Sequence, residues 1–410
     1  MGGILESLRE RGFVRETTDD AGLERLVASG PVTVYVGFDP TAPSLQLGNL
    51  VPILALAHLQ RAGHRPIVIM GGGTGMVGDP SGKTEMRKLL GTDEIGTNLG
   101  FFRDQFARFL DFSEGKALIL DNAEWLLPLN YIRFLREIGR NFSVNRMLAA
   151  ECFKIRLDSP TGLSFLEFNY MLLQAYDFLE LYRRHGCRLQ LGGSDQWGNI
   201  VAGIDLIRRV EGGEAFGMTI PLITTASGAK MGKTAEGTVW LSADRTSPYD
   251  FYQFWINTDD RDVGRFLRLF TFLPLEEIRP LEALQGADLR RAKEVLAFEA
   301  TRIVHGEEEA SKARAAARAL FGGGPEVGEG APSATLSASG LALGPLAVNL
   351  AADLGLCGSR GEARRLARQG GLYVNDDPVA EDRTLGPGDA RNGIIRFRAG
   401  KKRHLLVKVE

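Results

Sequence analysis

The strongest structural signal in the sequence lies in residues 34–50, which read Val34-Tyr35-Val36-Gly37-Phe38-Asp39-Pro40-Thr41-Ala42-Pro43-Ser44-Leu45-Gln46-Leu47-Gly48-Asn49-Leu50. Residues 31–38 are apolar, β-branched and aromatic, which predicts a buried strand. Residues 39–44 favour a turn, and from Gly48 apolar residues recur at helical spacing until residues 62–63. Because a helix start points unpaired N–H groups at the turn before it, this pattern predicts an anion site. An ordinary βα unit gives the same signals.

A second strand and a dense run of glycines follow this helix. Residues 65–70 are apolar and predict a strand, and residues 71–83 read GGGTGMVGDPSGK. Glycines at this density let a ligand approach the backbone closely, although a flexible loop would have the same composition. Two strands joined by one helix predict a right-handed βαβ unit and therefore a parallel sheet.

Polar residues recur on one face of a long predicted helix, residues 165–184. Tyr170, Gln174 and Asp177 are spaced i, i+4 and i+7, so all three project from the same face. A strand at 188–191 then leads into residues 192–197, a glycine-rich strand end that opens a helix at 198–210. The other predicted elements of this region are strands at 117–120 and 219–223 and helices at 4–12, 21–29, 85–112, 128–139 and 143–157.

The composition changes along the last part of the chain. A glycine-punctuated loop at 227–237 carries two lysines, and a helical, glycine-poor pattern follows. Residues 323–340 are rich in Gly, Pro, Ser and Ala and predict a flexible linker. The tail predicts a helix at 359–368 and strands at 372–374, 394–398 and 405–409. Arg360, Arg364 and Arg368 share one helix face, which is either a solvated surface or an RNA-backbone contact; a basic module on a tether favours RNA.

Length and composition bound the class of protein. A chain of 410 residues with 44% apolar and 24% charged residues indicates a soluble protein of two or three domains. The net charge of −2 argues against a uniformly basic coat for nucleic acid. The three cysteines have no pairing or zinc-ligand spacing, which predicts reduced thiols and a cytoplasmic protein. Residues 1–15 lack the apolar core of a signal peptide, and no segment predicts a membrane span.

Taken together, the motifs resemble those of bacterial tyrosyl-tRNA synthetases along essentially the whole chain. The segments that carry the resemblance are Tyr35–Thr41, Gly78–Lys83, Phe142–Asn145, Gly192–Asn199 and Phe251–Asn257. Lys230-Met231-Gly232-Lys233-Thr234 resembles the KMSKS loop of class I synthetases, and the tail resembles an S4 RNA-binding module. The resemblance implies an α/β, Rossmann-like nucleotide-binding domain with a parallel sheet at 1–246. An all-α anticodon-binding domain would follow at 247–322, then the flexible linker at 323–340 and a small α+β S4-like domain at 341–410.

The resemblance also implies a reaction and its partners. The chain would activate L-tyrosine with ATP to tyrosyl-adenylate and then transfer tyrosine to tRNA(Tyr). The attacking carboxylate is already an anion, so no general base is needed, and none of the five histidines lies in a motif. Mg²⁺ would accompany ATP on its phosphates, with no metal site of the protein and no tightly bound cofactor. The family forms homodimers through an insertion, here roughly residues 117–150, and has no membrane partner.

The family's site residues carry over by position. Tyr35 and Asp177 would contact the phenolic hydroxyl of tyrosine. The rest of the tyrosine set would be Asp79, Tyr170, Gln174 and Gln190. Residues for ATP and the adenylate would be Gly37, Asp39, Gly48, Gly193, Asp195, Gln196 and Lys233. Groups assigned to catalysis on the phosphates would be Thr41, Gln46, Asn49, Lys83, Arg87, Lys230, Lys233 and Thr234. Arg360, Arg364 and Arg368 would contact tRNA.

One position departs from the family pattern. Where class I synthetases have the HIGH tetrad, this chain reads Gln46-Leu47-Gly48-Asn49. The Gln46 amide can donate a hydrogen bond to a phosphate but carries no charge. Lys83 and Arg87, four apart at an expected helix start, are either phosphate ligands or surface cations. Asp177, in turn, is either a substrate ligand or a surface carboxylate. Two alternatives to an active tyrosine enzyme remain: a catalytically impaired RNA-binding paralogue and a tryptophanyl-tRNA synthetase relative.

Overall fold

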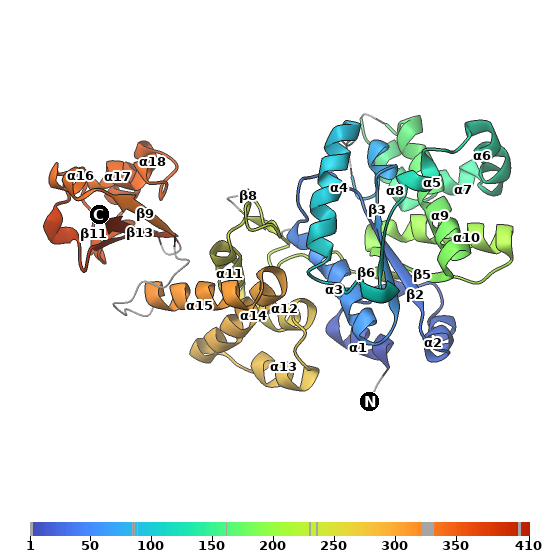
Figure 1. Cartoon of the computed structure of the whole chain (residues 1–410), viewed down its shortest axis with the longest axis horizontal. Coiled ribbons are helices and arrows are strands. Elements are labelled where there is room, and N and C mark those ends of the chain that lie inside the picture. The colour runs from blue at the N-terminus through green and yellow to red at the C-terminus, as the bar shows by residue number, and fades with distance from the viewer. Residues whose placement is uncertain are drawn as a thin grey trace. The chain divides into compact units, whose positions relative to one another are not determined.

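The computed structural model describes residues 3–83, 85, 87, 89–160, 162–228, 231–234, 237–321, 332–400 and 403–410, with backbone alone at 233, 234, 320 and 321. The chain divides into two compact units, one formed by Met1–Ser247 with Phe254–Val304 and the other by Pro248–Gln253 with His305–Glu410. Each unit is described by itself (Figure 1). No helix in the described ranges is long and apolar enough to cross a membrane.

A six-stranded sheet organises the first unit in the order β1-β6-β5-β2-β3-β4. The strands are β1 (Glu16–Thr17), β2 (Thr33–Phe38), β3 (Arg65–Met70), β4 (Leu118–Asp121), β5 (Cys187–Gly193) and β6 (Phe216–Ile220). All neighbouring strands are parallel except the short edge strand β1, so the predicted parallel sheet is confirmed. The strand order reverses at β2, which has β3 on one side and β5 on the other. Such a reversal opens a crevice at the carboxyl ends of the strands.

Helices cover both faces of this sheet. They are α1 (Ile4–Arg11), α2 (Asp20–Ala28), α3 (Leu47–Arg61), α4 (Thr92–Phe106), α5 (Ala123–Leu126), α6 (Tyr131–Glu137), α7 (Val144–Leu148), α8 (Glu151–Leu157), α9 (Phe165–His185) and α10 (Trp197–Glu211). In Figure 1, α3 and α4 lie on one side of the strands and α9 and α10 on the other. Strands covered on both faces are apolar without alternation, which explains the continuous apolar runs at β2 and β3.

Several predicted elements differ from the structure. The helix predicted at 85–112 begins only at Thr92, so Lys83 and Arg87 do not lie at a helix start. The helix predicted at 143–157 is two helices, α7 and α8, because Ala150 is extended between them. The last strand is β6 rather than 219–223, since Pro221 has no N–H to continue the ladder. The helix predicted at 128–139 is shorter, beginning after the Asn130 cap.

The helical region contains α11 (Pro248–Ile256), α12 (Val263–Phe270), α13 (Leu275–Glu282), α14 (Leu289–His305) and α15 (Glu307–Phe321). In the first unit, Trp255 is fully buried against the rings of Phe266 and Phe270. The buried Arg11 of α1 donates to the carbonyls of Arg268, Thr271 and Leu273, which lie at and beyond the end of α12. A buried guanidinium thus satisfies carbonyl groups that the helix end leaves without partners.

A five-stranded sheet in the order β11-β10-β12-β13-β9 forms the centre of the second unit's C-terminal part. Its strands are β9 (Ser333–Leu336), β10 (Leu372–Val374), β11 (Asp377–Pro378), β12 (Ile394–Ala399) and β13 (Arg403–Val409), and its helices are α16 (Ala338–Ala342), α17 (Ala347–Asp353) and α18 (Arg360–Arg368). β9 pairs in parallel with β13, so residues 333–336 belong to this sheet although 323–340 was expected to be a flexible linker. Residues 322–331 lie outside the described part.

The three cysteines, all of them described, are free and buried. Burial raises the pKa of Cys152 to about 11, and it also raises the pKa values of the Cys187 and Cys357 thiols. Thiols in such surroundings stay protonated at neutral pH and react slowly.

Candidate active site

A cavity of about 440 Å³ opens at the carboxyl ends of β2 and β5, where the strand order reverses. This volume is in the range of small-molecule sites. Most of the residues that the sequence assigned to tyrosine, ATP and catalysis line it: Tyr35, Gly37, Asp39, Thr41, Gln46, Asn49, Asp79, Lys83, Arg87, Tyr170, Gln174, Asp177, Gly193, Asp195 and Gln196. Gly48 lies in the first turn of α3 just behind Gln46, and Gln190 is buried in β5. The residues lining the cavity come from six separate segments of the chain.

One end of the cavity is closed by a buried carboxylate. Asp177 accepts hydrogen bonds from Asn122 Nδ2 at 2.9 Å and Trp125 Nε1 at 2.7 Å. Burial raises the pKa of Asp177 to about 7, although these two donors oppose the rise. Asp177 is therefore not a surface carboxylate, and the two hydrogen bonds hold its side chain in one orientation.

On β2 and β5, two buried side-chain atoms have no partner among the described residues: the Tyr35 hydroxyl and Gln190 Oε1. Burial, and next the nearby charge of Asp177, raise the pKa of Tyr35. Tyr35 and Gln190 are register partners on β2 and β5, and Tyr35 lines the cavity. A phenol hydroxyl can both donate and accept a hydrogen bond, whereas a carboxamide oxygen can only accept one. A buried polar atom without a partner costs about 1–3 kcal/mol, so this end of the cavity is suited to a ligand hydroxyl that accepts one hydrogen bond and donates another.

A second group of carboxylates lies further along the cavity. Asp39 accepts from Thr74 Oγ1 at 2.8 Å and from the Tyr170 hydroxyl at 2.9 Å. Burial, and next the nearby charge of Asp79, raise the pKa of Asp39 to about 6. The neighbouring carboxylates of Asp39 and Asp79 favour a cationic ligand in this part of the cavity.

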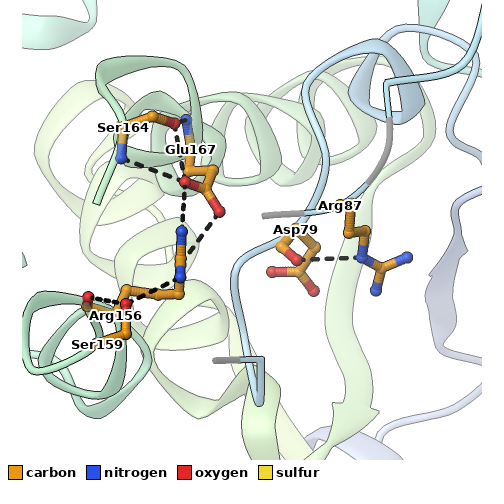
Figure 2. A network of polar contacts seen from close by, with 6 residues as sticks. All are labelled: Asp79, Arg87, Arg156, Ser159, Ser164 and Glu167. Carbon is orange, nitrogen blue, oxygen red and sulfur yellow. Dashed lines mark hydrogen bonds and ion pairs between the residues drawn. The ribbon is translucent and has the colours of Figure 1, made fainter. Parts of the chain in front are cut away.

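Asp79 belongs to a chain of amide side chains. Its Oδ2 accepts from Gln196 Nε2 at 2.7 Å, and Gln196 Oε1 accepts from Asn199 Nδ2 at 3.1 Å. Asn199 Nδ2 also donates to Gln174 Oε1 at 2.9 Å. The Asp79 carbonyl accepts from Arg87 Nε at 3.2 Å (Figure 2). These bonds connect the loop after β3, the face of α9 and the start of α10 into one network.

The start of α3 forms another part of the cavity wall. Gln46 is the N-cap residue, and Asn49 Oδ1 accepts from the Gln46 backbone N–H at 2.8 Å. The side-chain oxygen of Asn49 is thus used in a hydrogen bond at the start of the helix. A Cβ on Gly48 would meet nothing within 4 Å, which leaves the first turn of the helix open. Thr41 and Arg87 line the same cavity.

The segment after the lysine loop is attached to this helix start. Leu47 N–H donates to the Val239 carbonyl at 3.0 Å, and Leu241 N–H donates to the Leu45 carbonyl at 2.9 Å. Val239 N–H donates in turn to the Gly232 carbonyl at 2.9 Å. Lys233–Thr234 form β7, paired with β8 (Gly237–Thr238). Lys230 lies outside the described residues, and the side chains of Lys233 and Thr234 are not described.

The sequence missed four residues that support the site: Thr74, Asn122, Trp125 and Asn199. Asn122 directly follows β4, so its place at the carboxyl edge of a parallel sheet was a usable signal. The sequence contains no comparable signal for Trp125, because its hydrogen-bond partner Asp177 is distant in the sequence.

The predicted tRNA arginines are exposed on α18. Arg360 pairs with Asp353 at 2.9 Å, and Arg368 pairs with Glu381. Arg364 lies between them on the same face.

Comparison with known proteins defines the class. The family model described as tRNA synthetases class I (W and Y) matches residues 28–322, and the S4 domain model matches residues 347–390. The chain belongs to the class I tRNA synthetases.

Full-length relatives are more specific. The chain is 54% identical over 426 residues to a tyrosine–tRNA ligase of Desulfatibacillum aliphaticivorans, covering 99% of each chain. It is 51% identical over 411 residues to that of Clostridium botulinum, covering 100% of each. Among solved structures, a C-terminally truncated mitochondrial tyrosyl-tRNA synthetase of Aspergillus nidulans matches with a TM-score of 0.71 and 30% identity, over 78% of this chain and 95% of that one. Within the class, the chain belongs to the tyrosine–tRNA ligase family.

Proposed function

We infer that the chain activates L-tyrosine with ATP to form tyrosyl-adenylate and pyrophosphate, and then transfers tyrosine to the 3′ end of tRNA(Tyr). The observation that carries this proposal is the unpartnered Tyr35 hydroxyl beside the buried Asp177 at the closed end of the cavity. The phenol of tyrosine supplies both an acceptor for Tyr35 and a donor for Asp177. A tryptophan indole only donates, so it would leave the Tyr35 hydroxyl without an acceptor.

The same two residues explain rejection of phenylalanine. Phenylalanine would leave buried polar groups unpaired, which costs far more than a lost contact in water. Discrimination of about 10⁴–10⁵-fold is known for tyrosyl-tRNA synthetases.

The ammonium group of tyrosine fits the middle of the cavity. Asp79, Tyr170 and Gln174 face this region, and Asp39 holds the Tyr170 hydroxyl. The network through Gln196 and Asn199 fixes the direction of the acceptors. The substrate is thereby held at both ends, and its carboxylate is left free to react.

Activation needs no base from the protein. A carboxylate oxygen of tyrosine attacks the α-phosphorus of ATP, a new P–O bond forms, and the bond to the bridging oxygen of pyrophosphate breaks. Catalysis consists of holding these atoms in line and stabilising the charge that gathers on pyrophosphate. We assign the first turn of α3 with Gln46, together with Thr41, Lys83 and Arg87, to the phosphates. Lys230, Lys233 and Thr234 would contact them from the loop. Gly37, Asp39, Gly193, Asp195 and Gln196 would hold the ribose and adenylate.

Further partners follow from the proposed reaction. Mg²⁺ accompanies ATP and is held mainly by phosphate oxygens. The arginine face of α18 in the S4 domain contacts tRNA phosphates, which adds affinity without reading bases. We place the enzyme in the cytoplasm, in keeping with its unpaired cysteines.

Tyrosine-dependent exchange of labelled pyrophosphate into ATP tests the proposal. We expect exchange with tyrosine and none with phenylalanine or tryptophan at the same concentration. Folded protein without exchange above a tyrosine-free control would leave the RNA-binding paralogue as the better description.

A further inference from the structure

A buried ion pair lies outside the cavity, between α8 and the first turn of α9. Arg156 Nε donates to Glu167 Oε1 at 3.2 Å, and Nη2 donates to Oε2 at 3.1 Å. The side chains are only 1% and 2% exposed. Figure 2 shows the two planar groups facing each other, with Ser159 and Ser164 beside them. Two-point contact between planar groups fixes orientation as well as distance.

Glu167 also holds the start of α9. Its Oε2 accepts from the Ser164 hydroxyl at 2.8 Å, while Ser164 Oγ accepts from the Glu167 N–H at 3.2 Å. This reciprocal cap begins the helix at Phe165. Glu167 precedes Tyr170 by three residues and Gln174 by seven, so all three lie on one face of the helix.

The partner helix α8 contacts the other half of the ammonium site. The Cys152 thiol of α8 lies beside Ser81, two residues after Asp79. The Phe153 ring packs on Phe168 of α9 with centroids 5.2 Å apart. Helix α8 therefore bridges the loop that carries Asp79 and the helix that carries Tyr170 and Gln174.

We propose that the Arg156–Glu167 pair is a positioning device for the ammonium half of the tyrosine site: it holds the N-terminal turns of α9 so that Tyr170 and Gln174 face Asp79, whereas Asp177, further along the helix, is held separately by Asn122 and Trp125. The proposal rests on the tyrosine activation inferred above. Simple stability does not account for the pair, because apolar residues of similar volume commonly replace a buried ion pair without loss of stability. The distinct contribution of the ion pair is to fix the orientation of the start of α9.

The test uses a double variant, Arg156→Met with Glu167→Gln, which removes the ion pair without leaving a buried charge unpaired. Three ligands are titrated by calorimetry: L-tyrosine, tyrosinol, which keeps the ammonium but lacks the carboxylate, and 3-(4-hydroxyphenyl)propionate, which lacks the ammonium. We expect tyrosine and tyrosinol to bind about tenfold more weakly and the propionate to change by less than about twofold.

Arg156→Lys keeps the charge but not the two-point contact. This variant should show the same selectivity among the three ligands, with a smaller loss of affinity for tyrosine and tyrosinol, about threefold. It tests the proposal if the double variant does not fold. Arg11→Met is the matched control: it removes another buried arginine of the first unit, so it should lower the melting temperature while leaving the three affinities unchanged.

Equal weakening of all three ligands, or none in a folded variant, would overturn the positioning role. Absence of pyrophosphate exchange in the parent enzyme would instead refute the proposed function. The two failures are therefore distinguishable.

Discussion

Gln46 is a single residue on which the rate of the proposed reaction depends. It caps α3 and lines the cavity, at a position where class I synthetases commonly have a histidine. Its amide has a donor for a phosphate oxygen but adds no charge. The open first turn of α3 supplies further N–H donors and the positive end of the helix dipole.

Replacing Gln46 tests this donor. Gln46→Ala should slow adenylate formation by about ten- to a hundredfold, the effect of one positioned donor worth roughly 1.5–3 kcal/mol. Tyrosine affinity should hold, because the tyrosine end of the cavity is formed by other residues. Gln46→His should match or exceed the parent, most clearly toward pH 6 where imidazole is charged. Stopped-flow or quench measurements of the rate of adenylate formation test both variants. An alanine variant as fast as the parent would show that Gln46 acts only as a helix cap.

Asp177 gives a prediction about stability and pH. Its folded pKa of about 7 lies above the ordinary 3.8, so the folded state keeps a proton that the unfolded state releases. The free energy of unfolding should therefore fall as pH rises from about 4 to 7, by up to about 1.4 kcal/mol per pH unit from this residue. Urea unfolding of ligand-free parent and Asp177→Asn across this range checks the difference. If the free energies of unfolding of the two proteins changed in parallel with pH, the pKa of Asp177 would not be raised in the folded state.

The elements show which parts of the fold the sequence could predict. The unit β2–turn–α3 followed from apolar periodicity and turn residues, because both signals are local. The break between α7 and α8 was missed because Ala149 and Ala150 carry no helix-breaking signal. Lys83 and Arg87 line the cavity as expected, but from a non-helical segment. Contacts such as Trp125 with Asp177 depend on packing between distant segments, which periodicity does not report.

The segment after the lysine loop is joined to the start of α3 by backbone hydrogen bonds and by a close approach at Gly232. A Cβ on Gly232, where φ is +79°, would lie 3.0 Å from Leu47 Cβ. Gly228, in the same loop at φ +83°, would meet nothing within 4 Å.

These two glycines form a matched pair. Both alanine substitutions strain the backbone, but only Gly232→Ala also pushes on the residue next to Gln46. Adenylate formation should slow about tenfold more in Gly232→Ala than in Gly228→Ala, about 1.4 kcal/mol of activation free energy. Tyrosine affinity should be equal in both. Identical rates for the two variants would show that the contact with Leu47 has no part in catalysis.

For the whole molecule, the two reactions belong to different parts of the chain. The cavity is built entirely from the first unit, whereas the S4 match lies in the second. Removing residues 322–410 should therefore leave pyrophosphate exchange within about twofold and reduce tRNA charging severely. The remaining charging should depend less steeply on salt, because fewer phosphates are neutralised. If exchange and charging fell together, the tail would be needed for the fold of the catalytic part.

Exposed apolar residues gather along α5–α9. Ile132 is 69% exposed and Phe165 68%, and Leu127, Tyr131 and Val144 are also exposed. Several large exposed apolar side chains in one stretch of a chain are a candidate protein interface. We propose that a second copy of the chain covers them, so that the insertion at 117–150 forms a homodimer. Ile132→Glu should then weaken the dimer in sedimentation velocity. Leu343→Glu, which changes a leucine elsewhere that is 86% exposed, should leave it intact.

The burial of every cysteine makes the molecule convenient to label. A maleimide dye should ignore Cys152, Cys187 and Cys357 in the native enzyme and react with them only after unfolding. Ser227→Cys would add one accessible thiol at the edge of the lysine loop with only a small change in side-chain volume. Through the loop contacts with ATP proposed above, a fluorophore placed there should report ATP binding, on an enzyme whose own thiols contribute no background.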